Sequence, residues 1–308
     1  MRRKSYLLSS TSSRSDANTR AKHPFQRLRQ DNRAASPAIS TVIITSAVVV
    51  MVLVAMVYAN NFLDARLAEN EFATNKQFML TTSLQIDDIA WTIGRAQTVR
   101  YSSRYGQVDF EPGVLTYTLQ VHYEGKDPET FTWDTGAVMF NMPVDKFTMG
   151  NGYFEQTFPA SDWSFIQSGP SAPVSHVFAI EKLNIEAGSY NRVVVVPSIR
   201  MMPDANIDSQ TYVRLYLPLL MSGESLHRSQ SVTLVGKNVT QYVFKDVTQV
   251  QVSVSYPPLQ ESRGFDADFF KFNPDTIILD ESSVPPLPSG SIVELYVGEV
   301  TVSLGLHA

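Results

Sequence analysis

The sequence predicts an α+β protein in which a long N-terminal transmembrane and amphipathic helix precedes an all-β, sandwich-like extracellular head. Three observations support this prediction. An uncharged apolar stretch lies near the N-terminus, a seven-residue apolar repeat follows it, and apolar residues alternate with polar ones in much of the remaining chain. The chain has 308 residues, 44% of them hydrophobic, which is enough apolar surface for a folded domain.

Residues 1–34 are expected to be a disordered basic leader or cytoplasmic tail. Nine of the 25 Lys and Arg residues lie in residues 1–33, beside only Asp16 and Asp31, and the segment is rich in Ser and Thr. It has too little apolar surface to fold. Clustered basic residues can bind nucleic acid, but a basic flank beside a membrane span is explained by its effect on orientation, so no nucleic-acid partner is expected.

Residues 35–60 are predicted to be a transmembrane helix in contact with membrane lipid. The stretch 34–63 carries no charge. Its apolar centre of about 22 residues makes roughly 33 Å of helix, enough to cross roughly 30 Å of hydrocarbon, and it is too long for a cleaved secretory peptide. The basic flank predicts a single-pass membrane protein with a cytoplasmic N-terminus and an extracellular C-terminal domain.

Residues 61–100 are predicted to continue this helix as an amphipathic segment that ends near Val99. Apolar side chains recur every seven residues, at Phe72, Met79, Ile86 and Ile93, and make a one-sided stripe. The companion positions of the repeat are largely polar, which disfavours an autonomous coiled coil. We expect the stripe to pack on the protein's own head or on neighbouring copies.

Residues 101–308 are predicted to form the β-rich head. Apolar and polar residues alternate in four segments, residues 115–123, 213–219, 250–256 and 300–306. The run 193–196 is apolar throughout, as in a strand buried on both faces. Turn-rich segments separate these strands, and one of them, near residues 168–173, marks a candidate subdivision. We expect residues 101–308 to fold alone without a metal or cofactor.

The junction between the basic arm and the helix carries the most specific motif. Arg33-Ala34-Ala35-Ser36-Pro37 resembles the class III signal sequence of archaeal type IV pilin-like proteins, in which a basic and a small residue precede Ser-Pro and a long apolar helix. The resemblance implies that a prepilin-peptidase-type membrane protease cuts between Ala34 and Ala35. Pro37 suits a first helical turn because its φ is fixed and it lacks an N–H, and Ser36 can cap the helix.

Two features depart from this family. The fifth mature position is Ile39, where bacterial relatives carry Glu and archaeal ones often do not, and a 34-residue leader is long. Either the true start codon lies downstream of Met1 or the arm persists as a cytoplasmic tail. An uncleaved signal anchor is the alternative interpretation of the whole junction.

The resemblance also implies that the membrane helix is a polymerisation element. Thr41 and Thr45, and likewise Ala55 and Ala59, lie four residues apart, so each pair makes a small-residue patch where another helix could approach closely. The expected protein partners are therefore further copies of the chain or other pilin-like subunits. Small residues are common in any spanning helix, so the pairs alone do not decide this.

The sequence lacks recognisable catalytic motifs. It has no cysteine, no Gly-rich phosphate loop, no His-Glu-x-x-His and no Gly-x-Ser-x-Gly. His122, His176 and His227 are isolated in sequence, and the acidic clusters of the head lack the spacing of a calcium loop. We therefore expect no enzymatic activity, no cofactor and no metal. Asn238, in Asn-Val-Thr, is a candidate glycosylation acceptor.

Two classes of function remain. The first is a structural cell-surface subunit, pilin-like and in a minor or tip position given its large head, of an archaeal type IV pilus-like filament or pseudopilus. The second is a monomeric membrane-anchored surface protein whose β-head binds envelope components or ligands. The two classes share every sequence feature and differ only in the fate of the helix.

Overall fold

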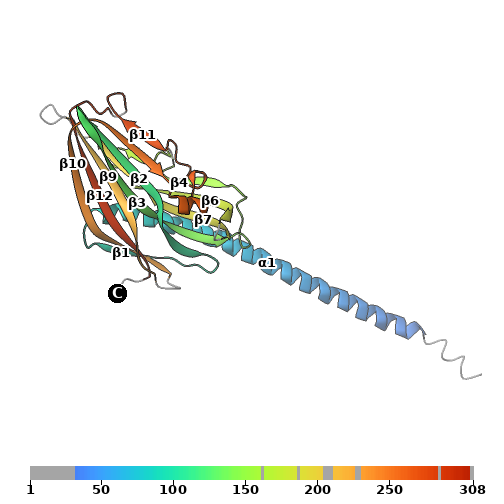
Figure 1. The fold of residues 1–308 in the computed structure, drawn as a ribbon. Helices are drawn as coiled ribbons and strands as arrows, with labels where there is room; N and C mark the ends of the chain where they lie inside the picture. Colours follow the sequence, from blue (N-terminus) through green and yellow to red (C-terminus); the bar gives the residue numbers. More distant parts are fainter. Residues whose placement is uncertain are drawn as a thin grey trace, which may run out of the picture. The chain divides into compact units, whose positions relative to one another are not determined.

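The computed structural model describes residues 32–160, 163–185, 188–203, 211–225, 230–283 and 286–305. The basic arm up to residue 31 lies outside the described residues. The chain divides into two compact units, Met1–Asn61 and Phe62–Ala308. The predicted α+β class is confirmed, since one long helix precedes a mixed sheet of 12 strands (Figure 1).

The helix α1 spans Asn32–Ala90. The elements that follow it are β1 (Ala96–Arg100), β2 (Gln107–Tyr123), β3 (Lys126–Pro143), β4 (Phe154–Phe158), β5 (Ile166–Ser168), β6 (Ser175–Ile185), β7 (Gly188–Pro197), β8 (Ile199–Pro203), β9 (Tyr212–Ser225), β10 (Ser231–Ser255), α2 (Pro258–Ser262), α3 (Ala267–Phe270), β11 (Thr276–Leu279) and β12 (Ser291–Leu304). Each of the four segments predicted from alternation falls largely within one of these strands, β2, β9, β10 or β12.

All the strands in the described ranges belong to one sheet, in the order β4-β6-β7-β3-β2-β10-β12-β9-β8-β5, with β1 and β11 also paired to β10. The pairs β9–β12 and β5–β8 are parallel, and the other pairs are antiparallel. The long strand β10 pairs with β1 and β12 through its first part and with β2 and β11 through its last part. Bulges at 236–238 and 244–247 bend it between these roles.

The sheet curls on itself, so one continuous sheet makes a sandwich-like interior. The backbone N–H of Leu220 in β9 donates to the Thr135 hydroxyl in β3 at 2.9 Å, although β3 and β9 are not neighbours in the strand order. The Tyr117 hydroxyl in β2 likewise donates to the Pro197 carbonyl in β7 at 2.7 Å. The interior that these strands enclose is called the strand-side core here, and it includes Tyr117, Leu119, Phe165, Phe178, Val194, Leu215, Val252 and Phe269.

The opposite face of the sheet carries a second core beneath α1. This helix-side core includes Ala68, Phe72, Met79, Ile86 and Ile89 of the helix and Val138, Phe140, Val193, Val195, Val232, Leu234 and Val300 of the strands. Residues 193–196 are fully buried and alternate between the two cores, which confirms the strand predicted to be buried on both faces. The expectation that the stripe packs on the protein's own head is met.

The helix ends earlier than the sequence predicted. It stops at Ala90 rather than near Val99, a turn follows, and Val99 lies in β1. Gly94 adopts a φ of +79° that favours glycine, and its N–H donates to the Gly236 carbonyl of the sheet at 2.8 Å. The predicted helical residue Ile93 therefore lies in the turn, where 65% of its surface is exposed.

The folded unit also begins earlier than predicted. The compact unit starts at Phe62, not at residue 101, because the helix from Ala68 to Ala90 supplies one side of the helix-side core. Residues on both sides of the segment 168–173 belong to the same sheet, through β5 and β6.

Candidate functional site in the membrane-type helix and the helix–sheet junction

The first unit offers an apolar helical surface. α1 carries a stretch long and apolar enough to cross a membrane, and none of that stretch is buried within the protein. From Ile39 to Asn61 every side chain is exposed. Apolar side chains in this number need lipid or other helices around them.

The predicted small-residue pairs lie on this exposed helix. Thr41, Thr45, Ala55 and Ala59 are all exposed. The Thr45 hydroxyl donates to the Thr41 carbonyl at 2.7 Å, one helical turn back. This bond satisfies the hydroxyl within its own helix, as a threonine in an apolar surrounding requires.

The predicted processing site lies at the start of the same helix. Ala34, Ala35, Ser36 and Pro37 are all helical in backbone conformation. Their side chains lie outside the described residues, as does the leader up to residue 31.

In the second unit, three of the four predicted stripe residues are buried against the sheet. Phe72, Met79 and Ile86 belong to the helix-side core. The ring of Phe72 lies 6.3 Å from that of Phe140 and 5.4 Å from that of Phe147. The fourth, Ile93, lies outside the helix and does not join them.

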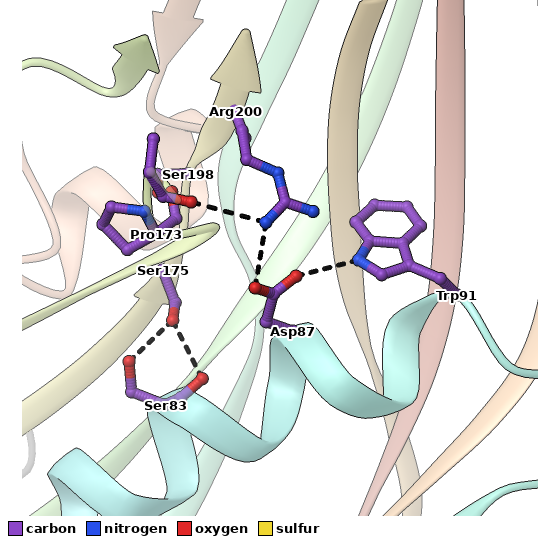
Figure 2. Close-up of polar contacts among 8 residues, drawn as sticks. Ser83, Asp87, Trp91, Pro173, Ser175, Ser198 and Arg200 are labelled. Atoms are coloured by element: carbon purple, nitrogen blue, oxygen red, sulfur yellow. Dashed lines mark hydrogen bonds and ion pairs between the residues drawn. The ribbon is translucent and has the colours of Figure 1, made fainter. Parts of the chain in front are cut away.

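The polar companions of the stripe are also part of this interface, which the sequence pattern did not reveal. Asn75, Thr82 and Ser83 are at most 1% exposed. The Ser83 and Ser175 hydroxyls lie 2.6 Å apart, and the Ser175 hydroxyl also contacts the Ser83 carbonyl at 3.2 Å (Figure 2). The Thr82 hydroxyl donates to the Phe78 carbonyl of its own helix at 3.0 Å, and the Asn75 amide donates to the Glu71 carbonyl at 2.9 Å and to the Ser102 carbonyl of the loop before β2 at 3.3 Å. Because each of these buried side chains has a hydrogen-bond partner, polarity at the companion positions does not weaken the packing.

An acidic residue one turn further along ties the helix end to β8. Asp87 accepts hydrogen bonds from the Trp91 indole N–H at 3.0 Å and from the Arg200 guanidinium at 2.9 Å (Figure 2). The same guanidinium stacks over the Tyr216 ring, 5.0 Å from its centroid. Helix, turn and two strands thus meet at one ion pair.

At the other end of the junction, Glu71 holds the loop that leads into β2. Its carboxylate accepts bonds from the Ser103 hydroxyl at 2.5 Å and from the backbone N–H groups of Arg104, Tyr105 and Gly106 at 2.9, 3.0 and 3.1 Å. Burial alone would raise the pKa of Glu71, but these donors stabilise the charged form and lower that pKa below its usual value.

Two glycines let the helix end approach the sheet backbone. A Cβ on Gly298 would lie 2.4 Å from the Ala90 carbonyl oxygen, and one on Gly236 would lie 2.5 and 2.6 Å from the carbonyl oxygens of Thr92 and Ile89. Neither glycine has a positive φ. Glycine is therefore required by close approach at both positions.

The candidate glycosylation site and the described histidines take no part in the contacts of this junction. Asn238 is exposed at the first bulge of β10, and its amide donates to the Thr240 hydroxyl at 3.2 Å. His176 is fully buried among aromatic rings, and burial lowers its pKa to about 3. His227 lies outside the described residues. Within the described ranges, no group of three or more His, Asp and Glu could hold a metal ion.

No protein-family model, curated protein or solved structure matches the chain. The first unit offers an exposed apolar helix, and the second fastens the continuation of that helix to a large sheet.

Proposed function

We propose that this protein is a non-enzymatic, pilin-like structural subunit of the archaeal cell surface, processed by a prepilin-peptidase-type protease and assembled with other copies or with related subunits. The observation that carries the proposal is the Arg33–Pro37 motif at the start of a helix that is unbroken from Asn32 to Ala90. A plain membrane anchor needs neither this motif nor a continuous helix.

The junction supports this proposal mechanically. A subunit that assembles through its helix must transmit force from the helix to its head. The Asp87–Arg200 ion pair, the Glu71 loop contacts and the close seating on Gly236 and Gly298 fasten the helix to the sheet along its second half. Such a joint suits a load-bearing subunit.

The exposed apolar helix supplies the assembly surface. A helix that leaves the bilayer exchanges lipid for other helices, and small residues allow the close approach that this exchange needs. Ala55 and Ala59 are exposed and one turn apart, so they are the contact points that we propose.

The test replaces Ala55 and Ala59 together by Leu, which keeps the segment apolar and able to span the membrane. We expect membrane insertion to persist and the protein to disappear from the high-mass fraction sheared from native cells. Val50→Leu with Val54→Leu is the matched control. It adds methylene groups to the same helix, but about 140° around its axis from Ala55 and Ala59. If wild-type protein stays in the membrane as a monomer, the second class, a membrane-anchored surface protein whose head binds envelope components or ligands, replaces this proposal.

A further inference from the structure

The loop of residues 102–106, which Glu71 holds, lies beside the end of the uncharged part of α1. The Tyr105 hydroxyl donates to the Asp64 carboxylate at 3.0 Å, and Asp64 is the first charged residue after the uncharged stretch 34–63. Asp64 follows the apolar centre of that stretch, residues 38–59, by five residues, or about 8 Å of helix. Any tilt of the helix only lowers its height above the hydrocarbon.

This height corresponds to the headgroup layer of a bilayer. The polar layer adds about 5–8 Å to the hydrocarbon on each side. When α1 spans a membrane, Asp64 and the loop bonded to it therefore lie among lipid headgroups. This conclusion depends only on the length of chain between the apolar centre and Asp64.

The exposed side chains at this level are of the kinds found at membrane interfaces. Phe62 and Leu67 belong to the folded second unit, yet 50% and 49% of their surfaces are exposed. The Arg66 guanidinium lies 5.3 Å from the Phe62 ring centroid, and the Arg104 guanidinium lies 5.2 Å from the Tyr105 ring centroid. Rings beside basic groups suit this boundary, because the rings contact acyl chains while the cations reach the headgroups.

The carboxylates around the loop already have partners. Glu69 pairs with Arg66 at 2.6 Å, Glu71 accepts from the backbone of the loop, and Asp64 accepts from its tyrosine. Within the described ranges, no carboxylate forms an ion pair with Arg104. Arg104 is exposed, so its guanidinium is left to donate to a group outside the chain.

The loop backbone holds Arg104 in a fixed place. The backbone N–H groups of Arg104 and Gly106 donate to the Glu71 carboxylate at 2.9 and 3.1 Å. A Cβ on Gly106 would lie 2.4 Å from the Phe140 ring and 2.7 Å from the Asn141 carbonyl oxygen, so the loop is tightly seated on β3. A binding loop that is ordered in advance loses less conformational freedom when it binds.

The charge distribution explains why a cation is needed at this boundary. Residues 1–33 hold nine of the 25 Lys and Arg and two of the 30 Asp and Glu, and the stretch 34–63 holds none, so residues 62–308 carry 16 basic against 28 acidic residues. An anionic membrane surface therefore repels the head as a whole. A guanidinium at the boundary offsets this repulsion, because it can donate two parallel hydrogen bonds to a phosphate group.

We propose that the loop 102–106 is a lipid-headgroup contact, in which the Arg104 guanidinium binds the phosphate of an anionic phospholipid in the leaflet on the head's side of the membrane. The contact goes beyond the proposed assembly function, since it acts while α1 is in the bilayer, whether the protein later assembles or stays a monomer. It holds the base of the head on the membrane surface and is released when α1 leaves the bilayer.

A label beside the loop tests this contact. The chain has no cysteine, so Ser102→Cys, at an exposed position, gives a single site for a fluorophore. The labelled full chain is reconstituted in phosphatidylcholine vesicles in which a small fraction of the lipid carries a nitroxide quencher near the headgroup end of its acyl chain. The quencher lipid is either phosphatidylglycerol or phosphatidylcholine, and the ratio of the two quenching constants measures local enrichment of the anionic lipid.

We expect about fivefold enrichment of phosphatidylglycerol beside the label, as one arginine at a membrane surface provides, and a ratio near one in Arg104→Gln. Arg104→Lys should keep part of the enrichment, because the charge remains while the paired bonds are lost. Lys237→Gln is the matched control and should leave the ratio unchanged. It removes one exposed cation next to Gly236, which contacts Ile89 at the far end of α1. The basic arm is expected at the other membrane face, where lipid that it attracts does not reach the label.

Weak quenching by both lipids would place the loop away from the membrane and overturn the contact, as would an unchanged ratio in Arg104→Gln. Inorganic phosphate that lowers the ratio more than sodium chloride of equal ionic strength would show that the site takes free phosphate, which also overturns it. Thermal unfolding of Arg104→Gln should match that of Lys237→Gln, so that a change of fold is detected separately. The vesicle measurements do not depend on filament formation, and their failure leaves the proposed assembly intact. Conversely, wild-type protein absent from any high-mass sheared fraction would overturn the proposed function and leave this contact standing.

Discussion

Replacing Gly298 by Ala should dislodge the end of α1 from the sheet. The added Cβ would lie 2.4 Å from the Ala90 carbonyl oxygen and 3.0 Å from the Trp91 ring, so the helix end must move by about 1 Å to restore normal contact. Since the φ of Gly298 is not positive, alanine adds no backbone strain and the effect isolates the contact. Overpacking of this kind costs about 1–3 kcal/mol.

The assay is urea unfolding of the full chain in detergent micelles, combined with hydrogen exchange of residues 86–92. We expect Gly298→Ala to lose about 1–3 kcal/mol of unfolding free energy and to show faster amide exchange at the helix end. Thr301→Ala, at a half-exposed position of the same strand, serves as the control. Gly236→Ala should have the same effect. The double variant should lose less unfolding free energy than the two single variants lose in total, because one shift of the helix end relieves both clashes. Unchanged stability and exchange in Gly298→Ala would refute the close seating.

Three further predictions follow from the same packing. Glu71→Gln should cost about 1–2 kcal/mol of unfolding free energy by chemical denaturation, because four donors lose a charged acceptor, whereas Glu69→Gln on the exposed helix surface should be nearly neutral. A fragment of residues 62–308 should be soluble and cooperative in unfolding, and a fragment of residues 101–308 should aggregate because its helix-side core is bare; equal behaviour of the two in gel filtration and thermal unfolding would contradict this. Burial lowers the pKa of His176 from an ordinary 6.5 to about 3 in the folded protein. Between these two pH values only the unfolded chain binds a proton at this residue. The free energy of unfolding therefore falls as pH falls, by about 1.4 kcal/mol per pH unit from this group. His176→Phe should remove that share of the slope in denaturation series from pH 7 to pH 4, and identical slopes would contradict the buried neutral ring.

The elements that could be predicted from sequence are those set by local periodicity. The apolar stretch, the helical stripe through Phe72, Met79 and Ile86, and the alternating strands all follow from the positions of neighbouring residues. The helix end could not be placed, because Ile93 continues the seven-residue repeat and no proline intervenes. The turn beyond the helix end is held by a long-range contact, from the Gly94 N–H to the carbonyl of Gly236.

Features that depend on strand pairing were also invisible in the sequence. The polar residues Asn75 and Ser83 looked like a weakness in the stripe, since their partners Ser102 and Ser175 lie far along the chain. The parallel pairing of β9 with β12 likewise depends on register between distant strands. A single sheet that curls on itself carries the same alternating pattern as two separate sheets.

The intact mass of the protein recovered from the sheared surface fraction of native cells tests the pilin-like assignment most directly. Cleavage between Ala34 and Ala35 predicts a chain that begins at Ala35 and lacks the basic leader. Replacing Ala34 by a bulky residue should block this cleavage and keep the protein out of the sheared fraction. A surface protein that still begins at Met1 would contradict the account.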